Sequence, residues 1–322
     1  MNNSFLKKYT ITVLLLMVTG FIILYHFIPD IKSPIIVADP AVWIVPDINA
    51  LPATPENATI KYGEQLIKNT AAYLGPKGNV AQISNGMNCG NCHLEEGTRT
   101  DANCFAMVAS SYPKFKARSG RMESIEFRVN DCMERSLNGK KLDSLSKEMI
   151  AIVAYIKWLG KDVPAKAKLK GIGLPNIDLL QRAASVNNGR AVYIAKCSSC
   201  HALNGEGVLN PNSIGYQYPP LWGNNSYNIS AGMYMISQLA RFVKYNMPYT
   251  ALQQQPTITD EEAWDVAAFI NSQQRPVKLF AQDWPAIKFK PFDFPFGPYT
   301  DTFSVQLHKY GPFEMIKNYS KK

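Results

Sequence analysis

The stretch NNGRAVYIAKCSSCH at residues 187–201 ends in a C-x-x-C-H motif, and a second such motif, CGNCH, occupies residues 89–93. This spacing is the attachment signal for a c-type haem. The two cysteines of each motif form thioethers to the haem, and the histidine after them binds the iron from one face. A zinc knuckle would need further Cys or His ligands, and neither motif has a second pair nearby. We therefore predict two covalently bound haem c groups, held by Cys89, Cys92, Cys197 and Cys200, with His93 and His201 as iron ligands.

The segments around the two motifs also repeat. Hydrophobic residues recur with the helical period before and after each motif, at residues 60–74, 146–159, 187–196 and 259–273. Gly63 and Gly189 lie in the two preceding helices, where a missing side chain lets another helix approach closely. Thr259 and Glu262 have the spacing of a capping box at the start of the last helix. The arrangement resembles the class I cytochrome c family, twice in tandem, and implies a mainly α fold with one covalently bound haem in each domain.

The composition is that of a folded protein. Hydrophobic residues make up 46% of the 322 residues and charged residues 18%, which excludes a disordered chain. Six cysteines are too few for a disulfide-dense scaffold. The formal charge of +9 is partly cancelled by the four carboxylates of two haems, so we expect no nucleic-acid partner.

An apolar run at residues 10–28 follows Lys7 and Lys8. At about 1.5 Å per residue, a helix of this length just spans a hydrocarbon core of about 30 Å. The flanking lysines place the N-terminus in the cytoplasm and the rest of the chain on the periplasmic side. We expect a retained membrane helix; the alternative is a signal segment that is cleaved to release the chain into the periplasm.

The other axial ligand of each iron must come from a small set of residues. The chain has four histidines, and His26 and His308 lie outside the haem domains, so His–His ligation would require His308 to fold back. Met247, in the NMP sequence before the last helix, is the predicted distal ligand of the second haem. A proline carbonyl in PPLWG, expected to be that of Pro220, is predicted to accept from the His201 ring.

The sequence around the first haem motif has no Met-Pro dipeptide at the position that corresponds to Met247. Cys132 lies 39 residues after His93 and is the candidate ligand, with its neighbour Met133 as a competitor. A disulfide between Cys104 and Cys132 is the structural alternative, because an unpaired thiol in an oxidising compartment needs either a partner or a task.

Longer stretches carry a more specific resemblance. The sequences CGNCHLEEGT, YPKFKAR, EFRVNDCMERSLNGK and AYIKWL, within residues 59–275, are similar to those of bacterial thiosulfate dehydrogenases. These dihaem cytochromes c couple two thiosulfates into tetrathionate, and some members run the reverse reaction. The resemblance implies an active site at the first haem with His93 and Cys132 as axial ligands. It also implies that Arg118 and Arg128 bind substrate, that Ser136 lines the site, and that the second haem releases electrons.

The chemistry of the substrate agrees with this implication. Two thiosulfate dianions about 5 Å apart repel by roughly 3 kcal/mol even in water, so fixed cations are needed. Arginine suits this role because its fork pairs with sulfonate oxygens and stays charged. The competing role for Arg118 or Arg128 is pairing with a haem propionate or simple solvation at the surface.

The chain is expected to contain six segments. In order, they are an N-terminal membrane anchor or signal segment (1–30), a proline-rich tether (31–58), cytochrome c domain 1 with the catalytic haem (59–165), a linker (166–185), cytochrome c domain 2 with the electron-transfer haem (186–275) and a C-terminal wrapping extension (276–322).

Two other functions compete with thiosulfate oxidation. An electron-transfer dihaem cytochrome without a substrate would have methionine at both irons and no need for Arg118, Arg128 and Cys132 together. A sulfur-oxidation cytochrome would instead join thiosulfate to a cysteine of a carrier protein. In the favoured function, the expected partners are thiosulfate or tetrathionate, an external electron acceptor or donor such as a small cytochrome c, and the membrane through the N-terminal helix.

Overall fold

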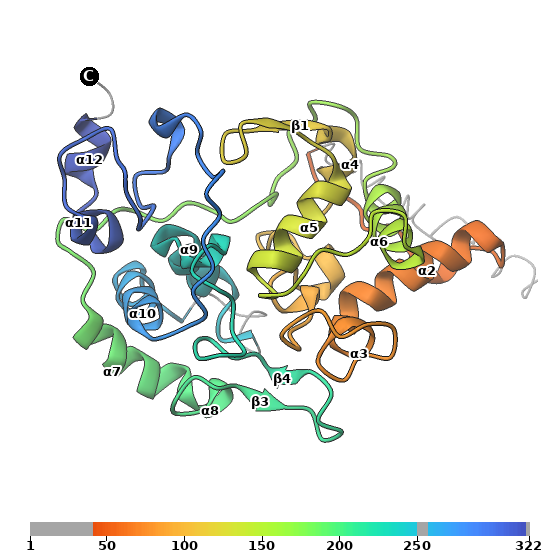
Figure 1. Ribbon diagram of the computed structural model, residues 1–322, viewed down its shortest axis with the longest axis horizontal. Coiled ribbons are helices and arrows are strands. Elements are labelled where there is room, and N and C mark those ends of the chain that lie inside the picture. Colours follow the sequence, from red (N-terminus) through yellow and green to blue (C-terminus); the bar gives the residue numbers. More distant parts are fainter. Residues whose placement is uncertain (1–40, 250–256, 320–322) are drawn as a thin grey trace, which may run out of the picture. The chain divides into compact units, whose positions relative to one another are not determined.

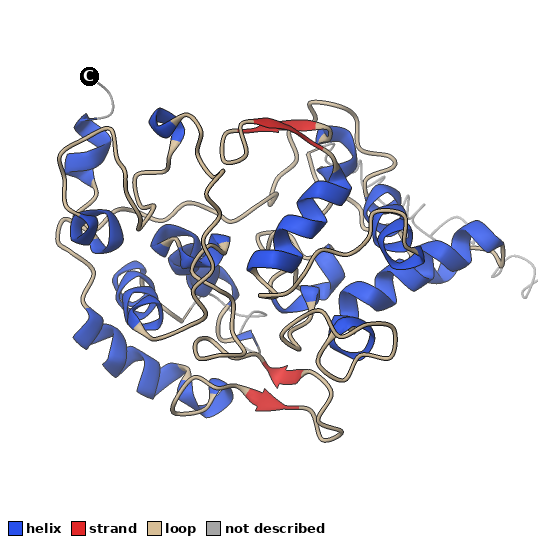
Figure 2. Ribbon diagram, viewed as in Figure 1, coloured by secondary structure: helices blue, strands red, loops and turns tan. Residues whose placement is uncertain are grey.

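The computed structural model describes residues 41–249 and 257–319, and these residues form mainly helices with short paired strands (Figure 2). This agrees with the predicted mainly α fold. The predicted membrane helix at 10–28 and the tether before residue 41 lie outside the described residues. Within the two described ranges, no helix is long and apolar enough to cross a membrane.

The elements follow one another in two similar series (Figure 1). Those before residue 160 are η1 (Ile48–Ala50), α2 (Pro55–Lys68), α3 (Thr70–Leu74), η2 (Cys89–Asn91), η3 (Glu95–Gly97), α4 (Val108–Ser111), β1 (Lys114–Lys116), β2 (Arg121–Glu123), α5 (Ile125–Arg135) and α6 (Lys147–Leu159). Those after it are α7 (Val186–Lys196), α8 (Ser198–His201), β3 (Val208–Leu209), β4 (Tyr216–Tyr218), η4 (Gly232–Tyr234), α9 (Ile236–Asn246), α10 (Asp260–Ser272), η6 (Ile287–Phe289), α11 (Val305–Tyr310) and α12 (Glu314–Tyr319).

The four predicted helices are present, with one difference. Where the pattern predicts a single helix over 60–74, α2 begins earlier, at Pro55, and ends before Asn69. Proline suits the first helical position, and the Thr54 side chain caps the start by accepting from Asn57 N at 3.2 Å. Asn69 leaves the helical conformation (φ −121°, ψ 36°), and α3 then starts as a separate turn.

Each haem-bearing half is closed by a pair of crossing helices. A Cβ added to Gly63 of α2 would lie 2.0 Å from the carbonyl oxygen of Ala151 in α6. A Cβ on Gly189 of α7 would lie 1.8 Å from the carbonyl oxygen of Asp265 in α10. The predicted close approach at both glycines is confirmed, since any larger residue would push the helices apart. The predicted capping box of α10, between Thr259 and Glu262, is also present.

The helices of each crossing contribute side chains to a hydrophobic core, one core for each half. The first contains Leu66 of α2 with Ile152 and Leu159 of α6, all at most 1% exposed. The second contains Trp264 and Ile270 of α10 and also receives side chains from the C-terminal extension, namely Tyr310, Phe313 and Ile316. The extension is therefore packed into the second core.

Two antiparallel strand pairs connect helices near the haem motifs. In the first, Lys114, Phe115 and Lys116 of β1 pair with Glu123, Met122 and Arg121 of β2. In the second, Val208 and Leu209 of β3 pair with Tyr218 and Tyr216 of β4, with an irregularity between the two pairs. The β1–β2 hairpin brings Lys116 and the Arg118 turn next to helix α5, which begins directly after it.

Candidate haem and anion-binding site

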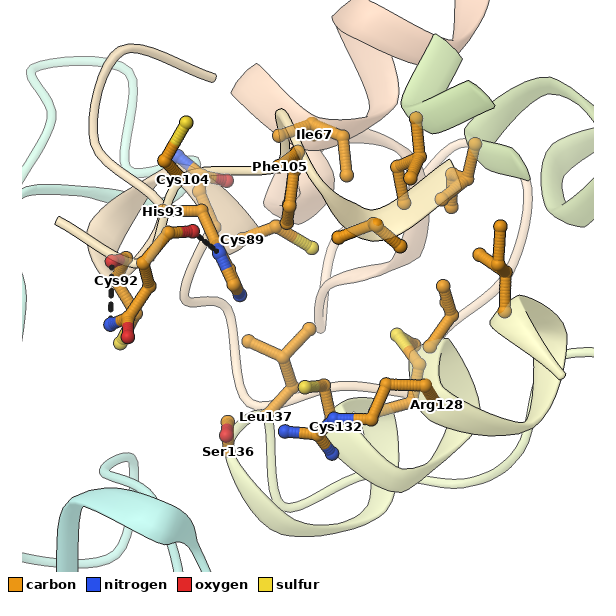
Figure 3. Close-up of a pocket in the computed structure, with 18 of the residues that line it drawn as sticks. Ile67, Cys89, Cys92, His93, Cys104, Phe105, Arg128, Cys132, Ser136 and Leu137 are labelled. Carbon is orange, nitrogen blue, oxygen red and sulfur yellow. Dashed lines mark hydrogen bonds between the residues drawn. The ribbon is translucent and has the colours of Figure 1, made fainter. Parts of the chain in front are cut away.

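The first haem motif lines a cavity together with helix α5. Cys89, Cys92 and His93 lie on one wall of this cavity, and Figure 3 shows the His93 ring pointing into it. The ring Nδ1 lies 2.7 Å from the carbonyl oxygen of Asn103, which leaves Nε2 for a metal. Burial lowers the pKa of His93 to about 4, so the imidazole is neutral, as an iron ligand must be.

The second motif has the same construction. Cys197, Cys200 and His201 line a second cavity, and the His201 Nδ1 lies 2.8 Å from the carbonyl oxygen of Pro219. The prediction that Pro220 accepts this bond was wrong by one residue. The Pro220 carbonyl instead accepts from the Ser226 hydroxyl at 3.3 Å, so its direction is set by the following turn.

Helix α5 provides the wall opposite the first motif. Arg128, Cys132 and Ser136 are spaced four residues apart, which places them on one side of the helix, and all three line the cavity. Figure 3 shows Cys132 and His93 reaching into it from opposite sides. Met133 also lines the cavity, but it is 1% exposed and packs into the first hydrophobic core.

Cys104 does not pair with Cys132. All six cysteines are free in this structure, and the Cys104 sulfur is turned away from the first cavity (Figure 3). The sulfur accepts from the backbone N–H of Ala106 at 3.4 Å, and burial raises the pKa of the thiol to about 11. The disulfide alternative is therefore not observed, and Cys104 is a buried structural residue.

The second cavity contains the methionine that the sequence singled out. Met247, which follows α9, lines it together with Met233. His308 does not reach either cavity, because its Nδ1 lies 2.7 Å from the Phe292 carbonyl and its Nε2 lies 3.1 Å from Asp301. Both ring nitrogens are thus engaged within the C-terminal extension, and the possibility that His308 folds back onto a haem is not observed.

A third cavity of about 480 Å³ adjoins the first. His93, Arg128, Cys132 and Ser136 line both, so the two cavities meet at the predicted ligands. Of these two cavities, Arg118 lines the third and not the first. The structure therefore brings together all four residues predicted for catalysis.

Several residues of the third cavity were not found from the sequence. Gln238, Met235 and Gly232 come from the second half of the chain, and Trp284 and Phe289 come from the C-terminal extension. Lys116 lies in the quoted YPKFKAR stretch but was not singled out, although a second basic residue two positions before Arg118 was a usable signal. No local pattern marks the others, because their segments are distant in sequence.

The lining of the third cavity carries more positive than negative charge, because two acidic side chains only partly balance three basic ones. Lys116, Arg118 and Arg128 face the acids Glu123 and Asp131. The interaction with Cys132 raises the pKa of Arg128 despite burial, and Asp131 raises it further. Burial lowers the pKa of Lys116, and the neighbouring Arg128 lowers it more. These positive charges favour a bound anion, which would offset their desolvation and mutual repulsion.

The two motif-bearing cavities share part of their walls. Met87, Cys92, Tyr227 and Met233 line both. The Arg275 guanidinium lies 4.2 Å from the centre of the Tyr227 ring and is buried. Its Nη2 donates to the Ile270 carbonyl at 2.6 Å, whereas its Nε and Nη1 have no acceptor among the described residues.

These observations fit two covalently bound haems. Each cavity has an unpaired cysteine pair and a histidine whose Nδ1 is already engaged. A buried cation with unused donors beside the shared wall suits a haem carboxylate. The described residues contain no group of three or more His, Cys, Asp or Glu side chains arranged to hold a metal ion directly, so the zinc alternative has no support there.

Comparisons with known proteins agree with the two halves of the structure. A family model described as "SoxA/TsdA, cytochrome c domain" matches residues 79–165, and the "Cytochrome c" model matches residues 186–274. The chain is 37% identical to a thiosulfate dehydrogenase of Allochromatium vinosum over 237 residues, which are 72% of this chain and 84% of that protein. It is 36% identical to a thiosulfate dehydrogenase of Psychrobacter arcticus, over 75% of this chain and 71% of that protein.

A solved structure is similar as well. The thiosulfate dehydrogenase TsdBA from Marichromatium purpuratum, in its as-isolated form, superimposes with a TM-score of 0.67 at 30% identity. The match covers 73% of this chain and 50% of the TsdBA chain. The predicted pair of cytochrome c domains, and with it the two covalently bound haem c groups, is confirmed.

Proposed function

This chain belongs to the thiosulfate dehydrogenase family, and we propose that it oxidises two thiosulfate ions to tetrathionate. One S–S bond forms, no bond breaks, and two electrons leave the substrates: 2 S₂O₃²⁻ → S₄O₆²⁻ + 2 e⁻. The observation that carries the proposal is the junction of the first haem cavity with a cation-lined cavity at Arg128, Cys132 and Ser136. The two haem c groups, when bound, would supply the redox chemistry, with capacity for the two electrons.

The cations have a defined task in this reaction. Two dianions must approach until their terminal sulfur atoms bond, and their repulsion grows as water is excluded. Arg118 and Arg128 are proposed to hold the sulfonate oxygens by paired N–H donors, with Ser136 as a further hydrogen-bonding partner. Lys116 lines the same cavity and adds a third positive charge. Holding both ions in place also offsets the entropic cost of bringing two substrates together.

The same geometry supports an assignment of the iron ligands. We assign His93 and Cys132 to the first haem, supported by their position on opposite sides of the cavity (Figure 3). We assign His201 and Met247 to the second, supported by their presence in one cavity. Met133 is the weaker candidate for the first haem because its side chain packs in the core. With these ligands, a thiolate would lower and a methionine would raise the reduction potential, which would favour electron flow from the first site to the second.

The remaining parts of the proposal concern direction, partners and location. The same site is able to run the reaction backwards, since its cations bind either anion. The walls shared by the two haem cavities support electron passage between them. We propose release to a small cytochrome c or similar carrier on the periplasmic side of the membrane. There the domains at 59–165 and 186–275 are held by the apolar run at 10–28, or are released if that run is cleaved.

The test is direct reduction of the purified, oxidised protein by thiosulfate under anaerobic conditions. We expect the reduced haem α-band to appear and tetrathionate to be recovered. Cys132→Gly should abolish this reduction, whereas the matched variant Cys104→Ala should retain it because the Cys104 sulfur is turned away from the cavity.

Two other results would change the conclusion. If thiosulfate gives no reduction but tetrathionate rapidly reoxidises the reduced protein, the same site is biased towards tetrathionate reduction. If neither happens, the proposal is wrong, and an electron carrier or an enzyme acting on a carrier-protein cysteine takes its place.

A further inference from the structure

Asp283 of the C-terminal extension contacts Arg118, which lines the third cavity. The Asp283 carboxylate accepts from both terminal nitrogens of Arg135 at 2.8 Å and from Arg118 Nε at 3.2 Å. All three side chains are largely buried, with 7% of Arg135, 11% of Asp283 and 18% of Arg118 exposed. The backbone is joined as well, since the N–H of Trp284 donates to the Arg118 carbonyl at 2.7 Å.

These contacts belong to a row of alternating charges. Arg118 pairs with Asp283, Asp283 with Arg135, Arg135 with Asp131, and Asp131 with Arg128. The two arginines proposed to bind substrate therefore stand at the two ends, and the two carboxylates separate the three guanidinium groups. Burial lowers the pKa of Arg118, the charge of Arg135 lowers it further, and Asp283 opposes both. Without Asp283, two buried guanidinium groups would face each other with no anion between them.

These contacts also determine which N–H groups of Arg118 are still free to bind a ligand. A guanidinium carries five N–H groups. Asp283 takes the Nε–H, and the Ser230 carbonyl takes one from Nη2 at 2.8 Å. The Trp284 and Phe294 rings lie 5.8 and 5.7 Å from the guanidinium carbon and limit its movement. Among the residues that the structure describes, three N–H groups of this cavity-lining side chain thus have no acceptor and remain for an oxyanion.

The extension also brings an unused donor to the cavity. Trp284 lines it, and its indole N–H is buried without an acceptor among the described residues. Trp284 adopts a positive φ of 60°, a conformation that costs energy for a residue other than glycine. A Cβ on Gly120 would lie 2.4 Å from the Pro285 ring, so the hairpin turn also makes room for this segment.

We propose that Asp283 is a positioning residue for the anion site, and that the C-terminal extension completes the cavity of the first domain. This inference rests on the proposed function, because it takes Arg118 as a substrate ligand. Asp283 itself repels anions, so it acts through Arg118: it fixes the fork in one orientation and separates it from Arg135. The ligand class is a sulfur oxyanion such as thiosulfate or tetrathionate.

The test compares Asp283→Asn with Asp301→Asn. Asp301 is also a buried carboxylate of the extension, but its partner is His308, which does not line the cavity, whereas the partner of Asp283 is the lining residue Arg118. Two quantities are measured: the KM and kcat for thiosulfate, and the affinity of tetrathionate for the fully oxidised protein by calorimetry. The oxidised protein has no electrons to give, so tetrathionate binding is measured without turnover.

We expect Asp283→Asn to weaken tetrathionate binding and raise the thiosulfate KM by roughly tenfold or more, with a smaller change in kcat. Asp301→Asn should lower the melting temperature without changing the KM. Unchanged tetrathionate affinity in folded Asp283→Asn, or equal KM values in the two variants, would overturn the inference. If Asp283→Asn does not retain both haems, Asp283→Ser replaces it, and wild-type tetrathionate affinity in that variant also overturns the inference.

The two proposals fail in different ways. A wild-type protein that neither oxidises thiosulfate nor is reoxidised by tetrathionate refutes the proposed function, whatever the variants do. Wild-type turnover together with wild-type anion binding in Asp283→Asn refutes only the role of Asp283.

Discussion

Asn246 donates from its Nδ2 to the backbone carbonyl of Asp101 at 2.9 Å, and this bond joins the two haem-bearing halves of the chain. Asn246 is 1% exposed and immediately precedes Met247. Asp101 lies two residues before Asn103, whose carbonyl orients His93. The segment that carries the proposed distal ligand of one haem is therefore tied to the loop that supports the proximal ligand of the other.

Breaking this bond should loosen the Met247 segment. Replacing Asn246 by Ala leaves the Asp101 carbonyl without its partner, and we expect a loss of about 1–3 kcal/mol in stability. Weaker methionine coordination should also lower the potential of the second haem. Thermal unfolding and a spectroelectrochemical titration measure the two effects. The exposed Asn212, replaced by Ala, is the control; equal potentials in both variants would contradict the role of Asn246.

The helix crossing at Gly189 should tolerate no side chain. Gly189→Ala would place a Cβ 1.8 Å from the Asp265 carbonyl oxygen, so α7 and α10 must separate, and we expect destabilisation of about 3 kcal/mol or more. The control is Gly232→Ala, because nothing lies within 4 Å of a Cβ at that position. Thermal melts followed by haem absorbance compare the two, and similar melting temperatures would show that the helices are not in close contact.

The stability of the second domain should depend on pH through Glu262. Its carboxylate accepts from Lys196 Nζ at 2.7 and 2.8 Å and from Thr259 N at 2.9 Å. Burial opposes the charged form, but these contacts outweigh it and lower the pKa of Glu262. A lowered pKa in the folded state stabilises the fold above the unfolded value of about 4.3, and this contribution is lost as the pH falls through the folded-state pKa.

Glu262→Gln should therefore be less stable than wild type by about 1 kcal/mol at pH 7. The difference should shrink as the pH falls below about 5 and vanish once the carboxyl is protonated in both states. Glu261→Gln is the control, because the Glu261 side chain is 71% exposed. A difference that persists unchanged at pH 3 would mean that the charge of Glu262 is not the cause.

Lys116 should contribute to anion binding through its charge. Lys116→Met keeps most of the apolar stem and removes one of three cations of the cavity, so we expect the thiosulfate KM to rise about threefold to tenfold at low salt. The effect should diminish at high ionic strength because salt screens the lost charge. Lys114→Met, two residues earlier on β1 and exposed, should leave the KM unchanged. Equal effects of the two substitutions would assign the change to the net charge of the hairpin.

Local patterns were sufficient for the helices and for the proximal halves of both haem sites. The crossing at Gly63, the capping box at Thr259 and the engagement of His201 by a proline carbonyl depend on residues close in sequence or on a repeated motif. The Asn103 carbonyl that orients His93 was not predicted. The error of one residue at Pro219 has a local cause, because adjacent proline carbonyls point in different directions and spacing alone does not choose between them.

The distal side of the site required the folded chain. Cys132 and Met133 are adjacent, and only the orientation of α5 sends one towards the cavity opposite His93 and the other into the core. The cavity beside them combines side chains from both halves of the chain and from the extension. Nothing in the sequence near Asp283 indicates an interaction with Arg118, because 165 residues separate them.

The sequence by itself determined that this protein carries two haems and that each sits in a helical cytochrome c unit, because a haem attached through Cys-x-x-Cys-His depends on five consecutive residues. The tertiary structure decided how the anion cavity is built: which arginine keeps free donors, which carboxylate separates the guanidinium groups, and that the C-terminal extension belongs to the site. Electrostatic interactions of buried charges act over distance in space, and only packing brings those charges together.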